Sequence, residues 1–151
     1  MLVLINMNFL LKKMIKYNLY KSPTIKHTKG NITKLITTSH SDYKGFGELY
    51  FSDIKFNQIK GWKKHKKMNI NLFLIEGIVK VVLAEIKNNN IVFEEILLTK
   101  NFYNHLFFRN NIYFAFKGIS KKTSRLMNFS NIHHDPKETL KIDLSEIKYK
   151  W

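Results

Sequence analysis

"NINLFLIEGIVKVVLAEIKNNNIVFEEILL", residues 69–98, consists of three apolar, β-branched runs separated by turn signals. The first two runs are rich in Ile, Val, Leu and Phe, and they meet at Glu76-Gly77, a pair typical of a tight turn. Asparagines 88–90 separate the second run from the third. We therefore expect consecutive antiparallel strands joined by hairpins throughout this stretch.

The same rhythm of short strands continues on both sides. Upstream, "GELYFSDIKFNQI" places first Leu49 and Phe51, then Ile54 and Phe56, at a period of two, and the phase slip around 52–53 predicts a turn or bulge. Downstream, the segments "HLFF", "NIYFAF", "RLMNFSNI" and "SEIKYKW" predict further strands. This spacing is typical of an all-β fold, and in a chain of this size it predicts a small jelly-roll barrel of antiparallel strands whose interior can hold one ligand.

Composition limits the chemistry. The 151 residues suffice for one ordinary domain. Because the chain has no cysteine, disulfides, thiolate metal sites and thiol catalysis are excluded. The net charge of +15 favours anionic partners, but the excess is nearly all lysine, as an AT-rich genome would supply, and Arg109 and Arg125 are the only arginines. Scarce arginine argues against specific nucleic-acid binding.

The first residues, "MLVLINMNFLLKKMIKY", superficially resemble a targeting segment. In a secretory signal the positive charge precedes the apolar run and a small-residue cleavage site follows it, whereas here the lysines follow. We expect an edge strand or a frayed helix instead. No other apolar run is long enough to cross a bilayer, so the sequence predicts a cytoplasmic protein that is not bound to a membrane.

His65 lies among lysines in "GWKKHKK", residues 61–67, directly before the apolar run that begins the opening stretch. Alternation along that run puts Asn69, Asn71 and Phe73 on one face. This face is polar enough to line a cavity, and it would suit a solvent-exposed face equally well. The residues alone thus leave two interpretations of His65: a solvated histidine in a turn, or a proton-transfer group in a site lined by lysines.

From Tyr43 to Trp151 the chain resembles the dTDP-4-dehydrorhamnose 3,5-epimerase family of cupins, in particular a short branch from surface-polysaccharide gene sets. The segments that carry the resemblance are "DYKGFGELYFSDI", "IKGWKKHKK", "LFLIEGIVKVV", "LTKNFYNHLFFRNNIYFAFKGIS", "NIHHDP" and "IKYKW". Their order and spacing are more specific than any one of them. On this basis we divide the chain into an N-terminal extension with the first edge strand or strands, residues 1–40, and a cupin domain, residues 41–151.

The resemblance implies a homodimeric jelly roll that binds a nucleotide-linked 4-keto-6-deoxy sugar without metal or cofactor. A histidine base removes a proton from C3 or C5, next to the keto group, and a tyrosine acid returns a proton to the opposite face. His65 matches the base. The residues expected to bind substrate are Lys60, Lys63, Lys64, Asn71 and Asn128. Among them the lysines make chemical sense because fixed cations stabilise both an enolate and a diphosphate.

The chain also departs from the family pattern. The acid tyrosine falls at Asn128, and the active-site lysine falls near Ile70 and Asn71. Tyr113 is the candidate replacement acid, although a barrel-core or rim aromatic is an equally good interpretation. The chain ends at Trp151, before the position of the late aspartate that pairs with the catalytic histidine.

The other histidines are weaker candidates. His105 lies on a predicted strand, where a packed and hydrogen-bonded histidine is the better interpretation. His133 and His134, followed by Asp135, suggest a metal site, but adjacent strand residues point to opposite faces and cannot easily share an ion. We therefore expect no metal.

Three functions follow in order of preference. The first is an isomerase acting on a nucleotide-linked keto sugar in surface-polysaccharide synthesis, with His65 as base. The second is a non-catalytic cupin that binds a sugar nucleotide or glycan, or that partners a pathway enzyme, because the family acid is missing. Nucleic-acid binding through the lysine-rich turn is the third.

Overall fold

The computed structural model describes residues 15–151, which form twelve strands and no helix. The strands are β1 (Tyr17–Tyr20), β2 (Thr24–Ile25), β3 (Ile32–Thr33), β4 (Glu48–Ile54), β5 (Ile59–His65), β6 (Ile70–Glu76), β7 (Ile78–Lys87), β8 (Asn90–Thr99), β9 (His105–Phe108), β10 (Tyr113–Gly118), β11 (Ser124–Ser130) and β12 (Thr139–Lys141). Within this described part of the chain, no helix could span a membrane.

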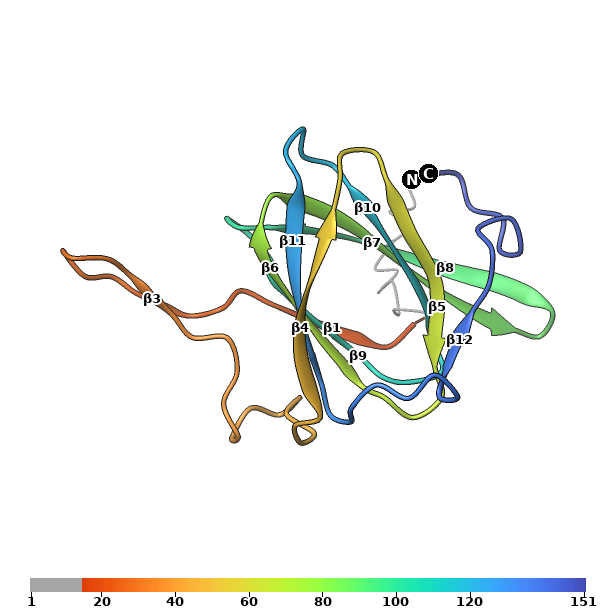
Figure 1. Ribbon diagram of the computed structural model, residues 1–151, viewed down its shortest axis with the longest axis horizontal. Helices are drawn as coiled ribbons and strands as arrows, with labels where there is room; N and C mark the ends of the chain where they lie inside the picture. The colour runs from red at the N-terminus through yellow and green to blue at the C-terminus, as the bar shows by residue number, and fades with distance from the viewer. Residues whose placement is uncertain (1–14) are drawn as a thin grey trace, which may run out of the picture.

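Two five-stranded antiparallel sheets face each other, which confirms the predicted all-β jelly roll (Figure 1). The first sheet has the order β1-β9-β6-β11-β4, and the second has the order β12-β5-β10-β7-β8. Sequence neighbours such as β4 and β5 lie in different sheets, as expected when a chain winds back and forth between the two layers. The short β2–β3 hairpin projects away from the barrel.

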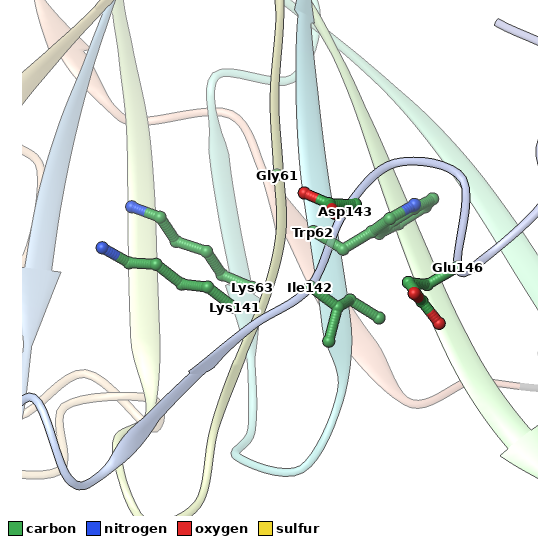
Figure 2. Close-up of a pocket in the computed structure, with 7 residues that line it drawn as sticks. All are labelled: Gly61, Trp62, Lys63, Lys141, Ile142, Asp143 and Glu146. Carbon is green, nitrogen blue, oxygen red and sulfur yellow. The ribbon is translucent and has the colours of Figure 1, made fainter.

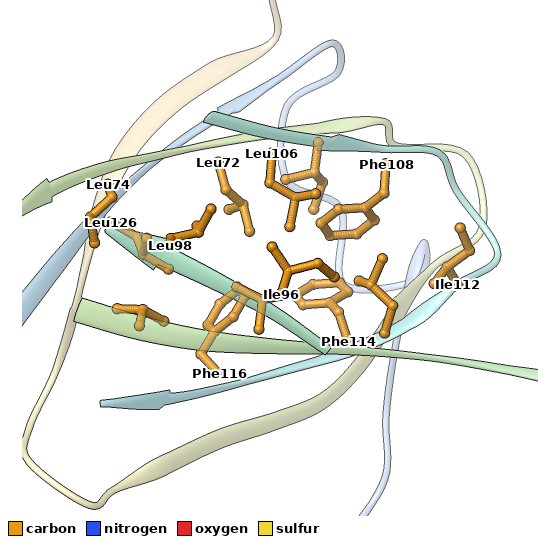
Figure 3. Packing of buried hydrophobic residues seen from close by; sticks show 14 of the residues in the cluster. Leu72, Leu74, Ile96, Leu98, Leu106, Phe108, Ile112, Phe114, Phe116 and Leu126 are labelled. Carbon is orange, nitrogen blue, oxygen red and sulfur yellow. The ribbon is translucent and has the colours of Figure 1, made fainter. Parts of the chain in front are cut away.

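The hydrophobic core fills the space between the two sheets (Figure 3). Leu72 and Leu106 contribute from the first sheet, and Val81 and Phe114 contribute from the second. Alternation along each strand directs every second side chain into the core. In a strand whose residues are all apolar, the remaining side chains pack on the outer face of the sheet.

The opening stretch forms the three predicted strands, but only one of the two expected hairpins. β7 and β8 pair along their full length, and Asn88 and Asn89 make the turn with positive φ values of 48° and 65°. β6 and β7 do not pair, because they belong to different sheets. Gly77 makes this corner at φ 83°, and a Cβ atom there would collide with Ser124. Glycine is therefore required for a crossover rather than for a hairpin turn.

Two further expectations are wrong. The predicted turn at residues 52–53 does not occur, because β4 runs unbroken to Ile54. The change of phase arises because Leu49 and Phe51 face outward whereas Ile54 is buried inside. The C-terminal segment 145–151 forms no strand; Ile147, Tyr149 and Trp151 instead pack against the outer side of the second sheet.

The expectation for the N-terminal segment falls mostly outside the described residues, since residues 1–14 are not described. Its last residue, Tyr17, begins β1, which pairs with β9 at the edge of the first sheet. β1, β2 and β3 precede residue 41, and the other nine strands follow it.

Candidate active site

A small cavity between the two sheets contains His65. His65 ends β5, its side chain is almost fully buried, and its ring stacks on Phe114 with the ring centres 5.6 Å apart. The cavity encloses about 60 Å³. Predicted site residues Lys60, Lys63 and Asn128 line it together with His65, so the structure brings four of the seven candidates to one place.

A carboxylate pairs with His65 although sequence comparison placed the family's aspartate beyond the end of this chain. The Nδ1 atom of His65 lies 2.8 Å from Oε2 of Glu138, which directly precedes β12. The hydroxyl of Thr139 lies 3.2 Å from the same Nδ1 atom. The other carboxylate oxygen, Oε1, accepts hydrogen bonds from the backbone N–H groups of Lys67 (2.7 Å) and Met68 (2.8 Å).

These contacts fix the charge of Glu138 and the tautomer of His65. Burial by itself would raise the pKa of Glu138, but the two backbone N–H groups and the His65 ring together hold that pKa below its ordinary value. An ionised carboxylate can only accept hydrogen bonds, so Nδ1 of His65 carries the proton. The remaining nitrogen, Nε2, is then a lone-pair acceptor, as a general base requires.

Three lysines give the cavity its positive charge. Lys60 and Lys63 come from β5, and Lys141 lies opposite Lys63 on β12. Figure 2 shows the side chains of Lys63 and Lys141 pointing the same way, away from Trp62. Burial, with Lys141 and Lys60 close by, lowers the pKa of Lys63. None of the described residues that line the cavity is acidic, so an anion would relieve this repulsion.

An irregularity in β5 places these lysines on one face. Along β10 the partners Phe114 and Phe116 are two residues apart, whereas their partners Lys63 and Lys60 are three residues apart. The extra residue is a β-bulge, which lets Lys60 and Lys63 both face the cavity. Gly61 sits in the bulge at φ 149°, where a Cβ atom would run into Ala115.

Tyr50 reaches the same cavity from the opposite wall. It lies on β4, directly opposite Asn128 of β11, whose side-chain amide donates to the Ser52 hydroxyl at 3.2 Å. The residue keeps 40% of its surface exposed, but burial around its phenol group, helped by the charge of Glu48, raises the pKa of Tyr50. Its hydroxyl is therefore protonated at neutral pH and able to donate.

The structure does not bring Tyr113 or Lys64 to His65. Both lie on the outer face of the second sheet, where Lys64 Nζ stands 4.4 Å from the centre of the Tyr113 ring. Tyr113 packs there against the cluster around Trp62. Strand alternation explains this placement, because Phe114, the neighbour of Tyr113, is the residue that faces the cavity.

Asn71 is also outside the cavity, and the predicted polar lining face of its strand is the outer face of the first sheet. The inward face of β6 carries Leu72 and Leu74 instead. Asn71 Oδ1 accepts a hydrogen bond from Nε2 of His105 at 2.7 Å, and its amide donates to the Asp42 carbonyl. His105 is thus the packed, hydrogen-bonded histidine that we expected, stacked on Phe73.

The two adjacent histidines lie beside different hollows. His134 lines the His65 cavity, whereas His133 lines a separate hollow of about 680 Å³ that also contains Lys66 and Lys137. No group of three metal-ligating side chains occurs among residues 15–151.

A larger hollow of about 510 Å³ lies beside Trp62, yet it is a poorer candidate for catalysis (Figure 2). Asp143 and Glu146 line it together with Lys63 and Lys141, so it has no excess of positive charge to attract an anionic substrate, unlike the His65 cavity. None of the described residues that line it is a histidine or tyrosine that could move a proton.

Sequence reasoning missed Glu138, Tyr50 and Lys141. Glu138 and Lys141 lie in the short segment "ETLK", which has too little periodicity to predict a strand. Tyr50 sits between two apolar residues that face outward, and the alternation in "ELYFS" was the one available signal that it faces inward.

No family model and no curated protein matches the sequence. Solved structures match its fold. A dTDP sugar isomerase from Desulfovibrio desulfuricans G20 is 20% identical, with a TM-score of 0.78 over 84% of this chain and 83% of that chain. A 3,4-ketoisomerase from Helicobacter canadensis is 17% identical, with a TM-score of 0.73 over 87% of this chain and 94% of that chain.

A third match is a dTDP-6-deoxy-D-glucose 3,5-epimerase from Legionella pneumophila Philadelphia 1, solved in complex with dTDP-4-keto-L-rhamnose. It is 11% identical, with a TM-score of 0.69 over 84% of this chain and 78% of that chain. At these identities the likeness establishes the fold, which is the jelly roll of dTDP-sugar isomerases and epimerases. The resemblance found in the sequence is thereby confirmed at the level of the fold.

Proposed function

We propose that this protein isomerises a nucleotide-linked 4-keto-6-deoxy sugar by moving a proton at a carbon beside the ketone, with His65 as the general base. The observation that carries the proposal is the buried His65–Glu138 pair, which directs a basic nitrogen into a cavity with three lysines. The match to solved sugar-nucleotide isomerases and epimerases supports the substrate class.

The chemistry follows from these groups. The 4-keto group acidifies the C–H bonds at C3 and C5, and Nε2 of His65 accepts one of these protons. Glu138 stabilises the imidazolium that forms, because its carboxylate stays ionised beside Nδ1. The enolate left on the sugar is negative, so the ammonium groups of Lys60, Lys63 and Lys141 stabilise it and the substrate diphosphate.

Tyr50 replaces Tyr113 as the proposed proton donor. Tyr50 and His65 come from different sheets and so approach the cavity from opposite walls. A base on one wall and an acid on the other are what inversion of a sugar carbon requires. Epimerisation at C3 and 3,4-keto transfer both begin with loss of the C3 proton, so the same base serves either outcome.

The cavity must widen when substrate enters. Its volume of about 60 Å³ is well below the roughly 300–1,000 Å³ usual for small-ligand pockets. Lys60, Lys63 and Lys141 carry long, flexible side chains, and they are the groups that we expect to move outward as the diphosphate binds.

We also propose a homodimer that works in the cytoplasm in surface-polysaccharide synthesis. The pathway and the location rest on the sequence resemblance. The dimer is supported by Leu49 and Phe51, which are 52% and 60% exposed on the outer face of the edge strand β4. Exposed apolar side chains gathered on one face are typical of an interface.

The test uses dTDP-4-keto-6-deoxyglucose with Tyr50→Phe and Tyr113→Phe as a matched pair. Wild-type protein should convert the sugar, and NMR of the product distinguishes epimerisation from 3,4-keto transfer. Tyr50→Phe should lower conversion by about 10²–10⁴-fold, the usual contribution of a general acid, whereas Tyr113→Phe should convert at the wild-type rate.

The alternative is a non-catalytic cupin that binds the sugar nucleotide, and Asn128 at the family's acid position favours it. Tight binding of several nucleotide-linked keto sugars without conversion of any of them would establish that alternative. If Tyr113→Phe lowered the rate of conversion and Tyr50→Phe did not, Tyr50 would not be the donor.

A further inference from the structure

Another hollow, of about 480 Å³, lies beside the last residues of β6, between the loop after β8 and the base of the β2–β3 hairpin. It shares no lining residue with the His65 cavity. Leu74 and Ile75 form an apolar part of its wall, and hydroxyl, amide and ammonium groups supply most of the rest. Its volume falls in the usual range for small-ligand pockets.

Two almost buried polar side chains line this hollow with unused hydrogen-bonding groups. Ser22 is 5% exposed and Asn104 is 9% exposed. The Ser22 backbone N–H donates to Asn104 Oδ1 at 2.7 Å, which fixes the orientation of the amide. The Ser22 hydroxyl has no partner within residues 15–151, and the Asn104 amide nitrogen makes no hydrogen bond in that part of the chain either.

A buried polar group without a partner destabilises a protein, so a bound molecule is expected to satisfy the Ser22 hydroxyl, and the open Asn104 amide is free to donate to the same molecule. The backbone around Asn104 is rigid: its N–H donates to the Tyr20 carbonyl at 3.1 Å, and its carbonyl accepts from Leu74 N–H at 2.7 Å. The amide is therefore held in place whether or not a ligand is bound, as a preformed site requires.

The groups around the hollow define the chemistry of that molecule. Lys21 and Lys100 place two positive charges beside it, and no acidic residue lines it among those described. The Asn104 amide donates, while the hydroxyls of Thr24 and Thr33, 3.1 Å apart, can donate or accept. A ligand with an anionic group, several hydroxyls and an apolar C–H face satisfies all of these features.

We propose that this hollow, the Ser22–Asn104 site, binds a sugar phosphate. Lys21 and Lys100 hold the phosphate at the rim, and Ser22 and Asn104 bind sugar hydroxyls inside. The site is independent of the proposed reaction at His65, so it stands or falls without that reaction.

The test is a titration of ¹⁵N-labelled full-length protein with α-D-glucose 1-phosphate, followed by NMR. The backbone amides of Ser22, Lys100 and Asn104 should shift together and saturate, at lower concentrations than with inorganic phosphate or glucose alone. Ser22→Ala and Lys100→Ala should each weaken binding by about tenfold, as expected for one hydrogen bond or ion pair. Lys121→Ala, which changes an exposed lysine outside the site, should leave the affinity unchanged.

Ser22→Ala carries a second readout, which a purely structural serine would not give. Removing an unpartnered hydroxyl should leave the melting temperature of the free protein unchanged or higher while affinity falls. The proposal is overturned if the three amides do not saturate, or if inorganic phosphate binds as tightly as the sugar phosphate. It is equally overturned if Ser22→Ala lowers the melting temperature and leaves the affinity unchanged, because the hydroxyl is then only a hydrated structural group.

Discussion

Replacing Glu138 by Gln should abolish the proposed proton transfer through the tautomer of His65. Glu138 accepts two hydrogen bonds from backbone N–H groups on Oε1, and its Oε2 accepts one from His65 Nδ1 and a longer one, at 3.4 Å, from the Thr139 hydroxyl. Glutamine has one oxygen and one NH₂ group. We expect its oxygen to stay with the two backbone donors, since the reverse orientation would face NH₂ against both of them.

The NH₂ group of the glutamine then faces Nδ1 of His65 and needs an acceptor there. The imidazole proton moves to Nε2, and the nitrogen that faces the cavity loses its lone pair. The loss of general-base catalysis should lower the rate by about 10²–10⁴-fold, with the fold retained because the backbone hydrogen bonds survive.

The assay measures incorporation of solvent deuterium into dTDP-4-keto-6-deoxyglucose by mass spectrometry, at saturating substrate. Glu146→Gln is the matched control, because Glu146 is an exposed acid in the same C-terminal part of the chain and makes no contact with His65. A folded Glu138→Gln protein that exchanges deuterium at the wild-type rate would refute the role assigned to this carboxylate.

The remaining predictions concern charge. Lys63→Ala should weaken dTDP binding by about tenfold in calorimetry at low salt, with Lys121→Ala as the control, and equal affinities would remove Lys63 from the diphosphate site. Burial, with His40 nearby, lowers the pKa of His105 from 6.5 to about 4, so the unfolded chain binds the extra proton between these pH values and stability is lost as pH falls through that window. The loss should approach roughly 3 kcal/mol by pH 4 in urea unfolding, and His105→Gln should flatten it; an unchanged acid limb would contradict this assignment.

The strand pattern of the sequence predicts most of the fold. Period-two alternation and asparagine-rich turns identify β7, β8 and their hairpin correctly. Gly77 shows the limit of such reasoning, because a glycine with positive φ can make either a hairpin turn or a corner between sheets. Which one forms depends on pairings with distant strands, and a local pattern contains no information about those pairings.

The sequence predicts only part of the candidate site, again because a local pattern does not determine the three-dimensional arrangement. Lys60, Lys63 and His65 share a face only because a bulge at Gly61 changes the alternation of β5. Regular alternation would have put Lys60 and Lys63 on opposite faces. The inward face of β10 belongs to Phe114 rather than Tyr113, which is a one-residue difference in register that the sequence alone does not determine.

Glu138 and Tyr50 could be identified as site residues only from the three-dimensional arrangement. Glu138 is 73 residues from His65 in the chain, and the two side chains meet only because β12 pairs with β5. Tyr50 lies opposite Asn128 across the β4–β11 ladder, so a tyrosine on the neighbouring strand stands beside the position of the missing acid. A comparison made position by position along the sequence cannot detect such a displacement between strands.

The central claim is that His65 removes a proton from a nucleotide-linked keto sugar, and deuterium wash-in tests it most directly. Wild-type protein and His65→Asn are incubated side by side in D₂O with dTDP-4-keto-6-deoxyglucose, and deuterium at C3 and C5 is read by NMR. We predict steady incorporation by the wild type and a loss of about 10²–10⁴-fold in the variant, with sugar-nucleotide binding retained. Incorporation at equal rates by the two proteins, or none by the wild type while it binds the sugar, would contradict the account.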